Sequence, residues 1–363
     1  MATAIVHEWW ANFGGAENVT RAISDLMPEA DVYILIKDVR GLDTGLKSRK
    51  QFESWISKVP GAKDRRLTIL LSPLAYRTLS FKKYDLIISS SHTFAHTTRF
   101  PNSRNANYLS YVHTPSRSIW TPEIDNRSSI LNLPLVRDSL KLLDKNLGRH
   151  VNAIAANSFE VQKRISKYWG RDSVVIHPPY DIEVSKPSYE NEIFDIPYKK
   201  KSYLVAAGRM VGYKNFHVAI EIAKRMNTPL VLMGSGPLES DLRQIAKEHK
   251  SEVHFEISPN KAMWNHVIEN AKAFLFPTYE DFGIAPLESI ALNTPVFALN
   301  LGGAREYIQE GINGRLVSSL DAENFTQAIN EYDFDRTSLN ETISQFNMSS
   351  FRSKFMNWID KEG

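Results

Sequence analysis

Two carboxylates, Glu280 and Glu288, lie on either side of a glycine in a segment whose residue types could bind a sugar attached to a diphosphate. The apolar run 273–276 before them predicts a buried strand, and Pro286 fits the first turn of a helix that follows. A helix N-terminus presents unpaired N–H groups and the positive end of a dipole, which favour a phosphate. Carboxylates accept hydrogen bonds from hydroxyls, and Gly283 allows the backbone to approach a ligand closely.

Two cations follow another apolar run, at 203–207, which we expect to be the first strand of a second domain. Arg209 and Lys214 occupy the turn between this strand and a helix that begins near Asn215. Fixed cations beside a leaving diphosphate would stabilise the negative charge that develops as the bond breaks. The alternative is a pair of ordinary surface cations.

Two histidines follow successive predicted strands in the first half of the chain. His92 comes after the run 85–89, and His113 comes directly after the run 108–112. Ligands of open parallel sheets bind at the carboxyl ends of the strands, so both side chains are placed at the ligand-binding edge. A single histidine is more often structural, but two at the same edge favour a functional role for His113.

A glycine pair, Gly14 and Gly15, separates a first predicted strand at 3–7 from a helix with apolar residues at helical spacing. This pair could let the backbone approach a phosphate or a reacting sugar. An ordinary strand-to-helix turn is the alternative.

The alternation of strands and helices occurs twice, which predicts an α/β protein with two doubly wound Rossmann-like domains facing across a cleft. We expect an N-terminal acceptor-binding domain at residues 1–184, a linker at 185–201 and a C-terminal nucleotide-sugar domain at 202–346. Phe351, Phe355 and Trp358 have helical spacing, so we expect a C-terminal helix at 347–363 that packs back onto the first domain.

Composition and motif spacing exclude several classes of protein. The chain has 363 residues and no cysteine, so disulfides and thiolate metal sites are excluded. The spacing of its ten histidines supports no metal site. Gly234-Ser235-Gly236 follows a strand, but Glu239 stands where a dinucleotide-binding fingerprint needs its third glycine. Asp333-Phe334-Asp335 lies in a polar segment, where solvated charge explains it better than a metal site.

The net charge of +3 is unevenly distributed, because Lys and Arg exceed Asp and Glu before residue 180 and the reverse holds after it. An anionic partner of the first half would explain this difference, as would a solvated basic face. The apolar stretch at 65–83 is flanked by cations and could lie against an anionic bilayer, or form a core helix with solvated ends. We find no signal peptide and no run of about 18 apolar residues. We therefore expect a cytoplasmic protein, with peripheral contact at the inner face of the plasma membrane as an option.

These motifs together resemble the retaining glycosyltransferases of family 4, which have the GT-B fold. The motifs that carry the resemblance occur in the order known for the family: Gly14-Gly15, Ser89 to His92, His-Thr-Pro-x-Arg-x-x-Trp from His113 to Trp120, Asn157-Ser158, Gly208-Arg209 with Lys214, and Glu-x7-Glu at Glu280 and Glu288. The last motif is the most specific. The segment that begins at His113 is most similar to bacterial O-antigen and exopolysaccharide mannosyltransferases that use GDP-mannose.

The resemblance implies a role for each matching residue. Glu288 would hold the ribose of the donor, and Glu280 would contact the transferred sugar. The remaining roles are sugar binding at His113, diphosphate neutralisation by Arg209 and Lys214, and donor contacts of Gly14, Gly15 and the backbone of Phe282, Gly283, Ile284 and Ala285. His92, Arg117 and Trp120 are candidates for the acceptor side. No metal and no other cofactor is expected, because the two cations neutralise the diphosphate.

Two departures from the family pattern weaken the choice of GDP-mannose more than that of the fold. Asn293 stands where relatives often have a glycine, although Asn can adopt the left-handed conformation. His96 stands where a lysine is common. Three hypotheses are open: a transferase that extends a lipid-linked glycan with mannose or with a UDP- or dTDP-linked sugar, an epimerase or hydrolase of sugar nucleotides, and a non-catalytic binding partner. No nucleic-acid partner is expected.

Overall fold

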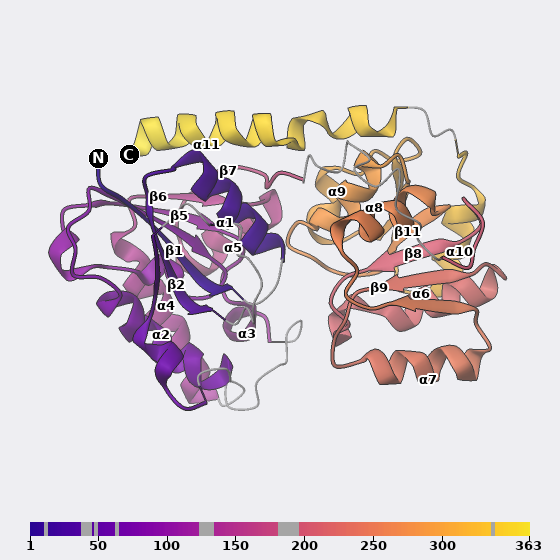
Figure 1. Ribbon diagram of the computed structural model, residues 1–363, viewed down its shortest axis with the longest axis horizontal. Coiled ribbons are helices and arrows are strands. Elements are labelled where there is room, and N and C mark those ends of the chain that lie inside the picture. Colours follow the sequence, from indigo (N-terminus) through magenta and orange to yellow (C-terminus); the bar gives the residue numbers. More distant parts are fainter. Residues whose placement is uncertain are drawn as a thin grey trace. The chain divides into compact units, whose positions relative to one another are not determined.

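The computed structural model describes residues 1–10, 14–37, 46, 50–61, 65–122, 134–180, 196–334 and 338–363. The chain divides into two compact units, which are coloured by sequence in Figure 1. The first unit comprises Met1–Pro178 and Ser349–Gly363, and the second comprises Pro179–Met348. The second unit thus begins before the linker expected at 185–201, of which residues 185–195 lie outside the described part of the chain.

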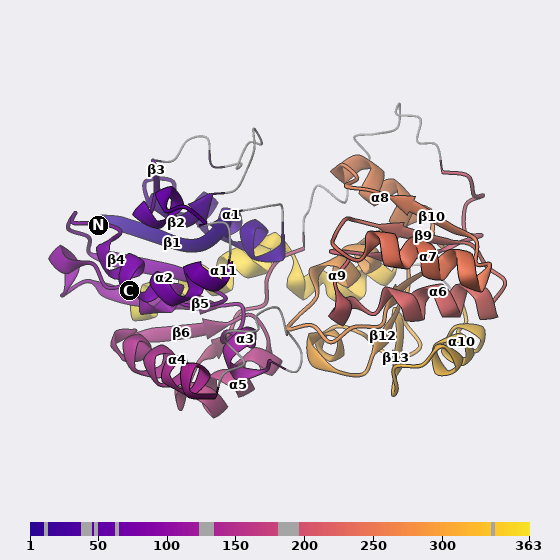
Figure 2. The ribbon, with the colours of Figure 1, turned by 90° about the horizontal axis from the view of Figure 1, so that it is seen from below.

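The first unit is built on a parallel sheet in the order β3-β2-β1-β4-β5-β6-β7, of which β3 to β6 are labelled in Figure 2. Its strands are β1 Thr3–Trp10, β2 Asp31–Lys37, β3 Gln51–Glu53, β4 Leu86–Ser91, β5 Asn107–Val112, β6 Ala153–Ala156 and β7 Val174–Val175. The order reverses direction between β1 and β4, and at such a point an open α/β sheet binds its ligands. Both strands are longer than expected: β1 continues through Glu8 to Trp10, and β4 continues to Ser91.

Helices connect these strands. They are α1 Gly15–Leu26, α2 Arg65–Thr78, α3 Arg117–Trp120, α4 Pro134–Leu147, α5 Phe159–Trp169 and the C-terminal α11 Met348–Glu362, with short 3₁₀ turns at Trp55–Lys58, Ala95–Thr97, Pro101–Ser103 and Gly148–His150. The rings of Phe351 and Phe355 on α11 lie 6.1 and 6.3 Å from that of Tyr111 on β5. The apolar spacing of the C-terminal segment is therefore used for packing within the first unit.

The second unit repeats the architecture with a parallel sheet in the order β10-β9-β8-β11-β12-β13. The strands are β8 Leu204–Ala207, β9 Leu230–Met233, β10 Val253–Glu256, β11 Ala273–Phe276, β12 Val296–Leu299 and β13 Gly314–Val317. The helices are α6 Phe216–Arg225, α7 Glu239–His249, α8 Lys261–Asn270, α9 Ile284–Ala291 and α10 Ala322–Asn330, with 3₁₀ turns at Gly212–Lys214, Gly302–Glu306 and Leu339–Phe346. Here the strand order reverses between β8 and β11.

The second sheet is buried on both faces. Val205 and Ala207 of β8 belong to one apolar cluster, and Leu204 and Ala206 belong to another. Alternate residues of a strand point to opposite faces, so the two clusters are the two cores of a doubly wound sheet. This explains why the strands read as short continuous apolar runs. The expected α/β fold class with two Rossmann-like domains is confirmed.

Candidate functional site

In the second unit, Lys214 and Glu280 form an ion pair at the carboxyl ends of β8 and β11. The Lys214 Nζ lies 2.6 Å from the Glu280 Oε1, and the two side chains are 13% and 19% exposed. The same ammonium lies 5.6 Å from the ring centroid of Phe276, the last residue of β11. The pair is therefore mostly shielded from water, but each side chain keeps an exposed part that a ligand can reach.

The backbone around this pair is held by hydrogen bonds between two loops. The Asn215 side chain donates to the Pro277 carbonyl (2.8 Å), and the Thr278 hydroxyl donates to the Tyr213 carbonyl (2.7 Å). These bonds join the loop after β8 to the loop after β11. They position Lys214 and Glu280 without help from a ligand.

Gly283 caps the N-terminus of α9 in a conformation that suits glycine, with φ at 88°. A Cβ atom at this position would lie 2.9 Å from the Tyr307 hydroxyl, so a larger residue would also clash. Tyr307 donates toward the carbonyl oxygens of Phe282 and Gly283, both 3.1 Å away. With no side-chain cap, the first N–H groups of α9, at Ile284 and Ala285, point toward a position that suits an anion.

Glu288 lies on α9 and is only 5% exposed. Two residues of α8 contact its carboxylate: Lys261 donates to Oε1 over 2.6 Å, and the Trp264 indole N–H donates to Oε2 over 3.0 Å. Neither partner was predicted, since nothing in the spacing of residues along α8 connects this helix with α9. Each carboxylate oxygen has two lone-pair positions, so Glu288 keeps capacity to accept hydrogen bonds from a ligand.

Arg209 lies in the turn after β8, and its side chain is exposed. No ion pair joins it to Glu280 in the described part of the chain, so only one of the two expected cations is fixed by a carboxylate.

In the first unit, a fully buried carboxylate organises the loop after β4. Glu8 Oε1 accepts hydrogen bonds from the backbone N–H groups of Thr93 (2.6 Å) and Ala95 (2.9 Å). Its Oε2 accepts from the N–H of His92 (2.9 Å) and lies 2.5 Å from the His92 Nδ1. Burial alone would raise the pKa of Glu8, but the charge of His92 and these hydrogen bonds lower it to about 2. His92 is thus tied to the buried carboxylate of Glu8, a residue that was not among the predicted site residues.

His113 belongs to a second buried network. Its Nε2 lies 2.8 Å from the Ser90 Oγ, which lies 2.7 Å from the Thr20 Oγ1. Thr20 in turn lies 3.0 Å from the His7 Nδ1. Burial, together with the nearby His92 and His7, lowers the pKa of His113 well below its usual value. His113 is therefore a neutral imidazole at neutral pH.

The indole of Trp120 has structural partners. Its N–H donates to the buried carboxylate of Asp144 over 2.7 Å, and its ring stacks on Tyr168 with centroids 4.7 Å apart. Asp144 also accepts from the indole of Trp169 and lies 3.2 Å from the Nε2 of His96. His96, which replaces the common lysine, thus helps to satisfy a buried carboxylate.

Arg117 begins α3 and is 9% exposed. Gly14 caps α1 with φ at −96°, a conformation open to any residue, and Gly15 is the first residue of that helix. The glycine pair is therefore not required by the local backbone conformation.

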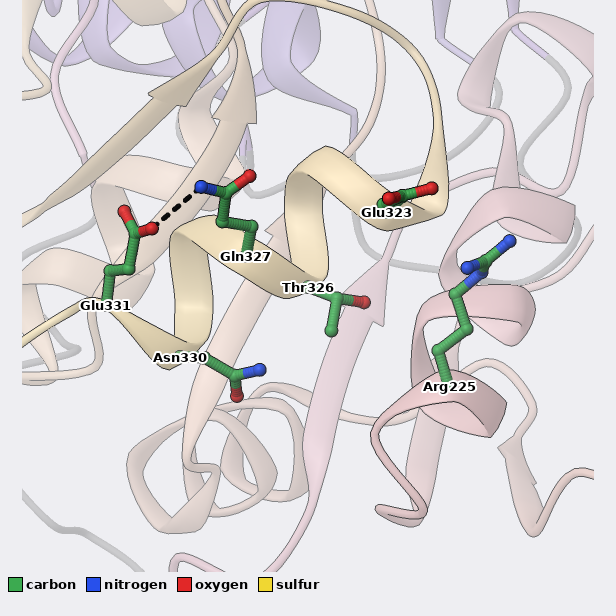
Figure 3. A pocket seen from close by; sticks show the side chains of 6 residues that line it. All are labelled: Arg225, Glu323, Thr326, Gln327, Asn330 and Glu331. Atoms are coloured by element: carbon green, nitrogen blue, oxygen red, sulfur yellow. Dashed lines mark hydrogen bonds between the residues drawn. The ribbon is translucent and has the colours of Figure 1, made fainter.

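A cavity of about 490 Å³ lies between α6 and α10 of the second unit (Figure 3). Its lining carries the positive charge of Arg225 and the negative charges of Glu323 and Glu331. None of the candidate site residues lines it. The described residues include no group of three or more side chains suited to hold a metal ion. None of the helices in these described ranges has the length and apolar character that crossing a membrane requires.

Comparison with known proteins gives two matches to family models. Residues 13–184 match the model described as Glycosyltransferase Family 4, and residues 189–345 match that of Glycosyl transferases group 1. The O-antigen chain mannosyltransferase C of Escherichia coli is 27% identical over 135 residues, which are 36% of this chain and 36% of that protein. The alignment thus spans about a third of that relative's length. The D-rhamnosyltransferase WbpZ of Pseudomonas aeruginosa is 22% identical over 73% of this chain and 70% of that protein.

Solved structures show the same fold. The structure of Anabaena Alr3699/HepE in complex with UDP and glucose matches 99% of this chain and 100% of that one, with a TM-score of 0.73 and 16% identity. WaaG, a glycosyltransferase involved in lipopolysaccharide biosynthesis, matches with a TM-score of 0.66 and 14% identity over 98% and 99% of the two chains. Both family models and the two doubly wound sheets agree, and the chain belongs to the family 4 glycosyltransferases with the GT-B fold.

Proposed function

We propose that this glycosyltransferase transfers mannose from GDP-mannose, with retention of the anomeric configuration, to a lipid-linked or polysaccharide acceptor in cell-surface glycan biosynthesis. The Lys214–Glu280 pair beside the N-terminus of α9 carries the proposal. The pair and the helix N-terminus together provide a fixed cation, uncapped N–H groups and a carboxylate. Cations and N–H groups bind a diphosphate, and a carboxylate binds sugar hydroxyls. The similarity to an O-antigen mannosyltransferase supports mannose as the sugar.

In the proposed reaction, Lys214 and Arg209 neutralise the diphosphate as the bond to the sugar breaks. The N–H groups at Ile284 and Ala285 add hydrogen bonds to the same developing charge, which makes a metal ion unnecessary. Glu280 loses part of its contact with Lys214 and accepts from a sugar hydroxyl. Glu288, held by Lys261 and Trp264, accepts from the ribose hydroxyls.

Retention in this proposal follows a same-face mechanism. The leaving phosphate accepts the proton of the acceptor hydroxyl as the new bond forms, so no protein nucleophile is used. Neutral His113 is proposed to bind the transferred sugar, and His92 and Arg117 remain candidates for the acceptor side. Trp120 is less suited to that role, since its indole N–H is already donated to Asp144.

A lipid-linked acceptor is supported by the surface of α2 in the first unit. Leu70 and Leu74, one helical turn apart, are 41% and 57% exposed, and the exposed Lys83 follows the helix beside Lys82, which pairs with Asp31. We propose that this face contacts anionic lipid at the inner side of the plasma membrane. Co-sedimentation with vesicles of phosphatidylglycerol and with neutral phosphatidylcholine vesicles tests it. Binding to the anionic vesicles that is lost in Leu74→Glu is the expected result, and equal recovery with both vesicles contradicts it.

The donor is tested by thermal shift with GDP-mannose, GDP-glucose, UDP-glucose, dTDP-glucose and the free nucleoside diphosphates, with and without EDTA. We expect the largest stabilisation from GDP-mannose, unchanged by EDTA. A larger rise in melting temperature with a UDP- or dTDP-sugar would identify that nucleotide sugar as the donor in place of GDP-mannose. The protein would still be assigned as a glycosyltransferase. No shift with any nucleoside diphosphate overturns the proposal.

Proton NMR of the preferred donor, incubated with enzyme and no acceptor, separates transfer from the alternative reactions. A transferase leaves the sugar nucleotide largely intact. Rapid release of free sugar or appearance of an isomer would establish a hydrolase or an epimerase. With an acceptor, the anomeric coupling constant of the product reports whether configuration is retained.

A further inference from the structure

Four buried side chains of the first unit, His7, Thr20, Ser90 and His113, form a continuous chain of hydrogen bonds, with contacts of 3.0, 2.7 and 2.8 Å. His7, Thr20 and Ser90 are fully buried, and His113 is 8% exposed. The chain joins three separate elements, because His7 lies on β1, Thr20 on α1 and Ser90 on β4. Each hydroxyl has one proton to donate, so the direction of each bond limits the next.

One end of the chain has a fixed direction. His7 Nε2 lies 3.1 Å from the Trp9 carbonyl oxygen, which can only accept, so Nε2 carries the proton. Burial and the neighbouring His92 lower the pKa of His7 to about 4, so its ring is neutral and its Nδ1 must accept. The donor to Nδ1 is the Thr20 hydroxyl.

Thr20 has a competing acceptor, the Ala16 carbonyl oxygen, at 2.8 Å. That oxygen is one turn earlier in α1 and serves as acceptor for the helical N–H of Thr20. The Ala16 carbonyl is therefore satisfied without the hydroxyl proton, whereas the buried Nδ1 of His7 is not. An unpaired buried acceptor is costly, so the proton goes to His7.

The rest of the chain follows. Thr20 has given its proton to His7 and accepts from the Ser90 hydroxyl. Ser90 has then given its proton to Thr20 and accepts from the Nε2–H of His113. The Nδ1 of His113 has no hydrogen-bond partner among the described residues, and His113 keeps 8% of its surface exposed, so we take this nitrogen as the atom that meets a ligand.

We propose that His7, Thr20 and Ser90 are positioning residues that hold His113 in the Nε2–H tautomer, so that its Nδ1 acts only as a hydrogen-bond acceptor toward a substrate hydroxyl. The class of ligand is thus a sugar that presents a hydroxyl, not a carbonyl or an ether oxygen, to this nitrogen. The effect on turnover rests on the proposed function, whereas the tautomer of His113 does not.

The test is long-range ¹H–¹⁵N correlation NMR of the histidine rings in the full chain at pH 7.5, with His113 assigned from its loss in His113→Gln. We expect a protonated-type shift for Nε2 and a pyridine-type shift for Nδ1. In Thr20→Val, the Ser90 hydroxyl loses its acceptor and turns to donate to Nε2. The His113 proton then moves to Nδ1, and the two nitrogen shifts exchange.

Two matched variants control the test. Thr20→Ser keeps the hydroxyl and retains the wild-type tautomer. Ser89→Ala removes a neighbouring buried hydroxyl of β4 that donates to Ser110 instead, and it also leaves the tautomer unchanged. Wild-type His113 with its proton on Nδ1, or the same tautomer in Thr20→Val as in wild type, overturns the proposal even if the enzyme is fully active.

Transfer kinetics form the second arm. In Thr20→Val, the Nδ1 of His113 carries the proton and becomes a donor, whereas the substrate hydroxyl needs an acceptor at this position. Turnover therefore falls about fivefold or more, and Thr20→Ser keeps wild-type turnover. A tautomer that responds as expected with turnover unchanged supports the positioning chain and removes His113 from the proposed reaction.

Discussion

The candidate residues of the two units balance their charges in different ways. In the second unit each candidate carboxylate, Glu280 or Glu288, has a lysine at 2.6 Å, and both Lys214 and Lys261 are partly exposed. In the first unit Glu8 is fully buried and is held chiefly by backbone N–H groups and His92, while His7 and His113 are neutral.

This difference separates two kinds of site. An ion pair that keeps a partly exposed partner loses less solvation than a fully buried one, so a ligand can replace that partner at a smaller cost. A buried charge or hydrogen-bond chain is expensive to disrupt, and it keeps its geometry whether or not a ligand is present. We therefore expect changes in the second unit to alter binding and turnover, and changes in the first to alter stability and protonation as well.

The largest effect is expected for Lys214→Met. Removing a fixed cation from a leaving diphosphate should lower turnover by about 100-fold or more, with little change in the melting temperature. Steady-state kinetics with the preferred donor measures it, and Lys224→Met on the exposed side of α6 is the matched control. Near-normal turnover in Lys214→Met would mean that the ion pair with Glu280 is structural, and the contrast between the units would disappear.

Glu8→Gln should have the next largest effect, on stability. The amide cannot serve all the donors that converge on Glu8, so the free energy of unfolding of the first unit should fall by about 3 kcal/mol. Chemical denaturation followed by tryptophan fluorescence measures the change. Glu17→Gln in the first turn of α1 serves as the comparison. A loss below about 0.5 kcal/mol would show that the buried carboxylate does not hold the loop.

The pH dependence of stability sharpens the same contrast. The folded pKa of His7, about 4, lies below its unfolded value, so its contribution is complete above pH 6.5 and is lost as pH falls toward 4. The folded pKa of Glu8, about 2, is also lowered, so its contribution is lost between about pH 4.5 and 2. Stability should therefore fall steadily on acidification. Glu8→Gln should remove the loss between about pH 4.5 and 2 and, because the charge of Glu8 raises the pKa of His7, should move the His7 part to lower pH. A flat profile from pH 7 to 4 would contradict the neutral buried His7.

Glu288→Ala should weaken donor binding by about tenfold and leave turnover at saturation nearly unchanged, because the ribose is remote from the reacting bond. Calorimetric titration with the nucleoside diphosphate measures it. Lys261→Met tests whether the partner on α8 positions the carboxylate: we expect a smaller loss in the same direction. Tighter binding in Lys261→Met would show instead that Lys261 competes with the ligand for Glu288.

The smallest effect concerns the turn after α9. Asn293 has φ at 54°, so the left-handed conformation expected at this departure from the family pattern is confirmed. Asn293→Gly should change stability by less than about 0.5 kcal/mol, whereas Asn293→Ala should cost about 1 kcal/mol. Thermal denaturation compares the two. Equal stability of both variants would show that residue 293 does not hold the left-handed conformation in the turn.

Much of the fold could be predicted from the sequence, because it depends on local patterns. Short apolar runs placed β8 and β11 within one residue of their observed bounds, since strands buried on both faces need continuous apolar residues. Pro286 indicated the first turn of α9, which begins at Ile284, for an equally local reason. The strand β13 was missed, because Gly314–Val317 is short and includes a glycine and an arginine.

The partners of the candidate residues could not be predicted in this way. Lys261 and Trp264 reach Glu288 from a different helix, and Glu8 holds a loop more than 80 residues later in the chain. By itself, the sequence determined which residue types stand at the carboxyl ends of the strands. Only the tertiary structure decided which of them are paired, buried or neutral, because charge balance and hydrogen-bond direction depend on contacts between segments far apart in the chain.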